Sequence, residues 1–138
     1  MTLIQRVALV FGVMFTAVAL LGFVTTGFAM PELHGMDQAK KLVGLFPVNV
    51  THNLVHLGFG LWGLAASRLT RTSMFYTMAS GAIYFVLAGI GMSYPNPLGV
   101  VPIGGWDVVL HLVIAALMVS FALFEAVRRG VPATQREL

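Results

Sequence analysis

The feature that most constrains this chain is a succession of four long apolar segments. They cover about residues 7–28, 47–66, 74–92 and 106–127, and each is close to the roughly 20 residues that a helix needs to cross a bilayer. Breaks rich in turn-forming residues separate them, such as SRLTRTS and SYPNPLGVVPIGG. The sequence therefore predicts an all-α protein in which residues 1–138 form one four-transmembrane-helix bundle.

The composition supports a membrane protein and excludes several other classes. Hydrophobic residues make up 58% of the chain and charged residues only 9%, whereas soluble domains carry about 25% charged residues. The chain has no cysteine, which excludes disulfides, thiolate metal sites and cysteine nucleophiles. Its basic residues occur singly or in pairs, so a nucleic-acid partner is not expected.

The distribution of lysine and arginine predicts the orientation in the membrane. If four helices alternate in direction, two lysines, Lys40 and Lys41, fall on one side, and all the arginines fall on the other: Arg6, Arg68, Arg71, Arg128, Arg129 and Arg136. Because positive residues are retained on the cytoplasmic side, both termini are expected to be cytoplasmic. The loops over residues 29–46 and 93–105 are then expected to face outward.

Four polar residues in the second apolar segment share one face of the expected helix. Their spacing of 0, 3, 4 and 7 places on one stripe Asn49, His52, Asn53 and His56. The same face continues with the small residues Gly60, Gly63 and Ser67, which allow another helix to approach closely. We therefore expect this stripe to face the bundle interior.

A second polar pair begins the fourth segment, where Asp107 and His111 are also one helical turn apart. The second and fourth segments both start at the outer surface and run inward, so they are expected to be parallel. At 1.5 Å per residue, the histidines of the two segments lie at overlapping depths. If the helices touch, His52, His56, Asp107 and His111 converge near the outer end of the bundle.

Three imidazoles and one carboxylate are suitable ligands for a divalent transition metal. Zinc accepts such nitrogen and oxygen donors in a tetrahedral shell, and iron and copper are further candidates, with nickel and manganese also open. The sequence thus predicts a metal site at His52, His56, Asp107 and His111, in which Asn49 and Asn53 orient the imidazoles.

Other interpretations of these residues stay open. A four-helix bundle can hold a b-type haem between His56 and His111, or a chlorophyll-type pigment in an electron-transfer or photosynthetic complex. The histidines can instead hydrogen-bond across helices in an accessory subunit without a ligand, or take part in proton handling. Asn49 or Thr51 can cap the second helix, and Asp107 can complement the dipole of the fourth.

Two further groups of residues have simpler interpretations. The third segment carries small and hydroxyl side chains at helical spacing: Thr77, Ser80, Gly81, Tyr84, Ala88 and Gly91. We interpret them as a packing seam, and the alternative is a cavity lining that offers hydroxyl groups, with Tyr84 near mid-membrane. His34, close to Glu32 and Asp37, is expected to be a solvated loop residue. No phosphate-binding glycine loop or nucleophile elbow is present, so the sequence does not decide whether the protein is an enzyme.

Four phrases, one in each segment, carry a resemblance to a known family: RVALVFGVMFTAVALLGFV, GLFPVNVTHNLVHLGFGLWGLAASR, AIYFVLAGIG and GGWDVVLHLVIAAL. They resemble an uncharacterised group of small bacterial four-helix integral membrane proteins, known only as a domain of unknown function. The resemblance covers about Arg6 to Glu125 and implies a single four-helix domain with no established activity. Together with the apolar segments, it leads us to expect a multi-pass protein of the bacterial inner membrane. It also implies that the family pattern includes His52, Asn53, His56, Asp107 and His111.

Two more distant comparisons bear on the ligand and on partners. Intramembrane metal hydrolases of the ceramidase type also gather three histidines and an aspartate, but on a seven-helix scaffold. Small b-type cytochromes share the four-helix scale. The expected partners are the lipid bilayer and either a larger membrane complex or further copies of the chain in a homo-oligomer.

Overall fold

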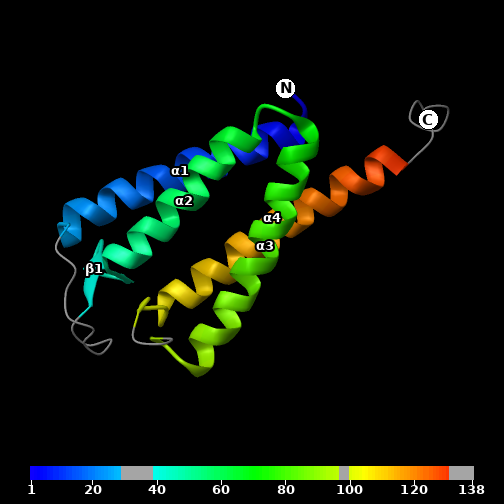
Figure 1. The fold of residues 1–138 in the computed structure, drawn as a ribbon. Helices are drawn as coiled ribbons and strands as arrows, with labels where there is room; N and C mark the ends of the chain where they lie inside the picture. Colours follow the sequence, from blue (N-terminus) through cyan, green and yellow to red (C-terminus); the bar gives the residue numbers. More distant parts are fainter. Residues whose placement is uncertain (29–38, 97–99, 131–138) are drawn as a thin grey trace.

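Four helices make up most of the chain (Figure 1). The computed structural model describes residues 1–28, 39–96 and 100–130; the expectations for His34 and Arg136 therefore lie outside the described residues. The helices are α1 (Leu3–Thr26), α2 (Val50–Ala66), α3 (Thr70–Ser93) and α4 (Trp106–Gly130). This arrangement confirms the all-α four-helix prediction.

Three of these helices, α1, α3 and α4, are long and apolar enough to cross a membrane. They have 24, 24 and 25 residues, whereas α2 has 17. Their composition agrees with a membrane protein, and the large side chains exposed on their outer faces are mainly aliphatic and aromatic.

A short β-hairpin explains why α2 is shorter than expected. Strands β1 (Lys40–Leu42) and β2 (Phe46–Val48) pair antiparallel, with Lys41 opposite Pro47. Pro47, where the second apolar segment begins, therefore lies in this strand and not in the helix. The helix begins at Val50, where the Asn49 side chain caps it by accepting a hydrogen bond of 2.8 Å from the backbone N–H of His52.

The helices form two antiparallel hairpins, α1 with α2 and α3 with α4, and the second hairpin crosses the first (Figure 1). Glycines bring α1 and α2 into close contact. A Cβ atom added to Gly63 would lie 2.8 Å from the Cα atom of Gly12, and one added to Gly60 would lie 2.7 Å from the backbone nitrogen of Thr16. The small face of α2 thus packs on α1, as its sequence predicts.

The face of α3 expected to be a seam is buried along its length. It meets α4 at Gly81, where an added Cβ atom would lie 2.8 Å from a Val119 methyl group, and at Gly91, where it would lie 3.1 Å from a Val108 methyl group. These two contacts set the register of the second hairpin. They place Tyr84 in the bundle core, opposite the first turns of α4.

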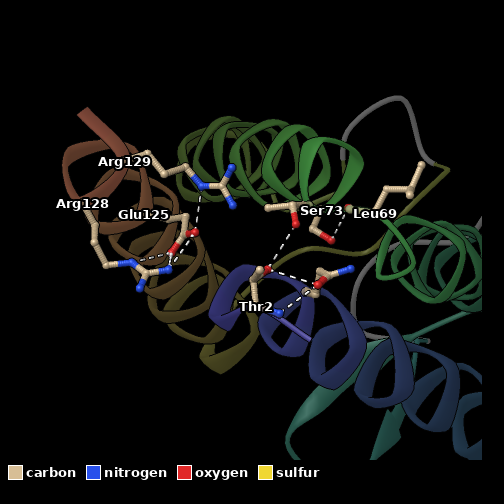
Figure 2. Close-up of polar contacts among 8 residues, drawn as sticks. Thr2, Leu69, Ser73, Glu125, Arg128 and Arg129 are labelled. Carbon is tan, nitrogen blue, oxygen red and sulfur yellow. Dashed lines mark hydrogen bonds and ion pairs between the residues drawn. The ribbon is translucent and has the colours of Figure 1, made fainter. Parts of the chain in front are cut away.

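Polar contacts hold the end of the bundle that contains the N-terminus (Figure 2). The Thr2 hydroxyl lies 3.4 Å from that of Thr70, and the Gln5 side chain donates to the backbone carbonyl of Arg68 at 2.9 Å. At the same end, the fully buried Glu125 carboxylate accepts from the guanidinium groups of Arg128 and Arg129 at 3.0 and 2.8 Å. The turn between α2 and α3, which contains Arg68, therefore lies at the same end of the bundle as the last turn of α4, which contains Arg128 and Arg129.

Candidate metal centre

The predicted site residues meet between the two helix hairpins, at the end opposite the arginines. His52 and His56 belong to α2 and their ring centroids are 4.5 Å apart. His52 lies 6.1 Å from the ring of His111 on α4, and Tyr84 on α3 stacks on His111 at 4.9 Å. Along their described lengths α2 and α4 do not pack extensively, so these side chains bridge the space between them.

Three of the four expected ligands form a compact group. Each of His52, Asp107 and His111 offers one donor atom, and these atoms all lie within 4.8 Å of one another. All three residues are buried. Tetrahedral zinc ligands, at about 2.1 Å from the metal, lie about 3.4 Å from one another, so coordination would require the donor atoms to approach one another by at most about 1.4 Å.

Backbone carbonyls orient two of the imidazoles. The Nδ1 atom of His111 lies 2.7 Å from the carbonyl oxygen of Asp107, and that of His52 lies 3.2 Å from the carbonyl oxygen of Pro47. Because a carbonyl only accepts hydrogen bonds, each Nδ1 atom acts as the donor. In a neutral His111 imidazole this leaves the lone pair on Nε2, which is the arrangement common in metal-ligating histidines, whereas His52 also contacts the backbone carbonyl of Pro102.

The Asp107 carboxylate lies in a buried position where a nearby cation would stabilise its negative charge. It lies in the first turn of α4, where the helix dipole favours an anion. Its Oδ2 atom is 3.4 Å from His111 Nδ1 but accepts no hydrogen bond from the described residues. A buried acceptor in that condition calls for another partner, and a metal ion meets the requirement.

His56 lies beside the group of three and outside it. Its ring stacks on Phe15 of α1, with centroids 5.8 Å apart and an interplanar angle of 14°. Its Nδ1 atom has no hydrogen-bond partner among the described residues. His56 therefore offers a fourth donor next to the other three.

The two asparagines make structural contacts. The Asn49 amide donates to the carbonyl of Val100 at 2.7 Å while its oxygen caps α2. The Asn53 amide donates to the Thr26 hydroxyl at 2.9 Å and lies against Gly22 of α1. Neither observed bond reaches an imidazole nitrogen, and a role in orienting the imidazoles stays a prediction for both residues.

Two functional features were not assigned from the sequence. The first is the stacking of Tyr84 on His111: the sequence offers Tyr84 as part of the α3 seam or as a hydroxyl that lines a cavity, whereas its ring contacts both Phe15 and His111. The sequence gives one indication of this contact: Tyr84 is a large polar residue on a face of small residues. Such a ring needs a neighbouring side chain to pack against. The ion cluster at Glu125 was also missed, although an acid followed by arginines three and four residues later indicates it.

A family comparison covers almost the whole structure just described. The family model described as a domain of unknown function, DUF4383, matches residues 5–124. The chain belongs to DUF4383. Comparison with curated proteins and with solved structures finds no match. Membership of DUF4383 confirms the resemblance seen in the four phrases and assigns no activity to the histidine cluster.

Proposed function

We propose that this protein binds one divalent transition-metal ion through His52, Asp107 and His111. The observation that carries the proposal is the convergence of their three donor atoms within 4.8 Å, although the residues come from two helices that are distant in sequence. Two imidazole nitrogens and one carboxylate oxygen suit zinc, iron or copper. Ionisable residues inside membrane helices are costly and usually mark function.

His56 faces the fourth coordination position in this proposal. Its ring is 4.5 Å from that of His52 but its donor atoms are not in the compact group. It therefore binds the metal more weakly than the other three ligands and is the one most easily displaced. A site with three firm protein ligands and one exchangeable position is the arrangement that catalytic metal sites use.

Two observations favour a metal ion over a haem or pigment. Asp107 is part of the ligand group, and carboxylates are not among the usual haem ligands. The cavity next to the histidines has a volume of about 260 Å³, below the roughly 300–1,000 Å³ of pockets for drug-sized ligands. A tetrapyrrole would need more space than the bundle provides between His56 and His111.

The proposal places the metal in a multi-pass protein of the bacterial inner membrane, as one four-helix domain with cytoplasmic termini. The described arginines lie at the end of the bundle that holds the N-terminus, and the Lys40 ammonium contacts the Thr25 carbonyl, at 3.2 Å, near the opposite end. This asymmetry supports an outward-facing metal site. We also propose, as the sequence leads us to expect, that the protein assembles with further copies of itself or with a larger membrane complex.

The direct test is elemental analysis of protein purified in detergent without chelators. We expect about one equivalent of zinc, iron or copper per chain, and no Soret band in the visible spectrum of the same sample. His111→Ala is expected to remove the metal, because it deletes a ligand from the compact group, and His56→Ala to reduce the bound fraction less.

His34→Ala is the matched control, since His34 is the remaining histidine of the chain, and its metal content should equal that of the unchanged protein. Metal-free protein after growth and purification with added zinc, iron and copper would overturn the proposal. A Soret band that disappears in His111→Ala would replace it with the haem alternative.

A further inference from the structure

A cavity of about 260 Å³ adjoins the histidine cluster. One wall carries the polar side chains His52, His56, Tyr84 and His111. The remaining lining consists of six aliphatic side chains from α2, α3 and the segment before α4, Leu87 among them. The cavity therefore has a small polar wall and is otherwise hydrocarbon.

The lining reaches the outer surface of the bundle between α2 and α3. Val55 and Ile90 line the cavity, and they are 37% and 36% exposed on helices whose outer faces are apolar. α2 and α3 belong to different hairpins, so the gap between the hairpins leads to the cavity. In a bilayer this side faces lipid, and a molecule dissolved in the membrane has direct access to the histidine wall.

The lining also limits the chemistry of an occupant. Among the described residues, the lining contains no lysine, arginine, aspartate or glutamate, so in the absence of a bound metal an ionised carboxylate or a phospholipid headgroup would be buried without a counter-charge. Its volume exceeds the about 150 Å³ of an engineered cavity that binds benzene and is below that of drug-sized pockets. One ring, or a short chain with a single polar group, fits these limits.

We propose that this cavity binds the oxygen-bearing end of a neutral, membrane-dissolved carbonyl or hydroxyl compound, whose apolar tail remains in the lipid. The oxygen lies at the histidine wall and the hydrocarbon part contacts Val55, Leu87 and Ile90. The contact between this oxygen and a metal ion rests on the proposed function, whereas occupancy of the apolar cavity does not require the metal.

Photolabelling in lipid nanodiscs tests this proposal. Three probes of equal chain length carry a diazirine near the polar end: a long-chain alcohol, the matching fatty acid and a phosphatidylcholine. In protein stripped of metal with a chelator, we expect the alcohol probe to label lining residues severalfold more than the other two. Excess unlabelled long-chain ketone should compete with it, and excess phosphatidylcholine should not.

Two tryptophan variants provide a matched comparison. Leu87→Trp fills the cavity and should lower labelling by the alcohol probe severalfold. Val86→Trp adds the same side chain at the neighbouring position, which is 61% exposed outside the cavity, and should leave labelling unchanged. The competition arm remains decisive if Leu87→Trp fails to fold, and equal labelling by all three probes would overturn the inference.

Metal content, measured on the same samples, separates this inference from the proposed function. If the untreated protein binds a stoichiometric metal but the chelator-stripped protein shows no selective alcohol labelling, the cavity inference alone is contradicted. If the protein is labelled selectively by the alcohol probe but remains metal-free after metal is added, the metal proposal alone is contradicted.

Discussion

Asp107 shows at the scale of one residue why a buried ionisable group in this fold requires explanation. It is only 2% exposed and shares its helical turn with His111. The helix dipole stabilises its charge only in part, because one carboxylate oxygen accepts no hydrogen bond from the described residues. Leaving such a group in an apolar bundle costs free energy, which a bound cation would offset.

The variant Asp107→Asn tests this interpretation. It keeps the shape of the side chain but removes the anionic ligand, so we expect metal affinity to fall at least about tenfold, the range seen when even supporting groups of metal sites are changed. Without metal, the variant should be as stable as the parent or more stable, because a buried charge is gone. Competition with a chromophoric chelator and thermal unfolding in detergent measure the two effects.

Glu125→Gln is the control at the other end of the same helix. It removes a carboxylate that is paired with Arg128 and Arg129, so thermal stability should fall while metal affinity stays unchanged. An Asp107→Asn variant with parental metal affinity would show that the carboxylate is not a ligand.

At the scale of elements, glycine positions set how closely α2 approaches α1. An added Cβ atom at Gly63 would lie 2.8 Å from the Gly12 backbone and 2.7 Å from the Tyr76 hydroxyl, whereas Gly58 on the same helix has no atom within 4 Å of that position. The backbone of α1 cannot move away without opening the first hairpin. The two glycines therefore have opposite structural roles within one helix.

Replacing each glycine by alanine should separate these roles. Gly63→Ala is expected to destabilise the protein by about 1–3 kcal/mol, because the added methyl group overpacks a tight contact. Gly58→Ala should stabilise it by up to about 1 kcal/mol, since alanine is the better helix former. Equilibrium unfolding in mixed micelles measures both, and equal effects of the two variants would contradict the close-contact account.

The elements also show what the sequence could and could not predict. Apolar length and turn-forming breaks predicted all four helices, and the spacing of Asn49 to His56 predicted a buried stripe, which is observed for His52, Asn53 and His56. The sequence did not predict the β-hairpin, because Phe46–Val48 is as apolar as a helix and its strand partner is a lysine pair. The positions of His52 and His111 along two parallel helices predicted that the two residues lie near each other. The spacing of residues along a helix does not, however, show which histidine donor atoms converge.

At the scale of the whole molecule, the candidate site lies between two hairpins that are each held together by their own close contacts. Its ligands come from both hairpins, so metal binding is expected to join them. The arginine-rich end and the site end are opposite ends of the bundle. The orientation of the molecule thus decides which compartment would supply a metal ion to the candidate site.

Single-cysteine labelling tests that orientation, and the chain suits it because it contains no native cysteine. Val43→Cys lies in the β-hairpin turn and Leu69→Cys in the turn between α2 and α3, at side chains that are 75% and 64% exposed. A membrane-impermeant maleimide should label Val43→Cys in intact spheroplasts and Leu69→Cys only after permeabilisation. The reverse pattern would place the metal site on the cytoplasmic side.

The short length of α2 has a consequence for the membrane itself. Its 17 residues span about 25 Å, against about 36 Å for the 24 residues of α1, while a bilayer has a hydrocarbon core of about 30 Å. On the proposed four-span topology, we expect the bilayer to be thinner beside α2 than beside α1. Such thinning at the start of α2 would shorten the path by which ions from the water phase reach the cluster.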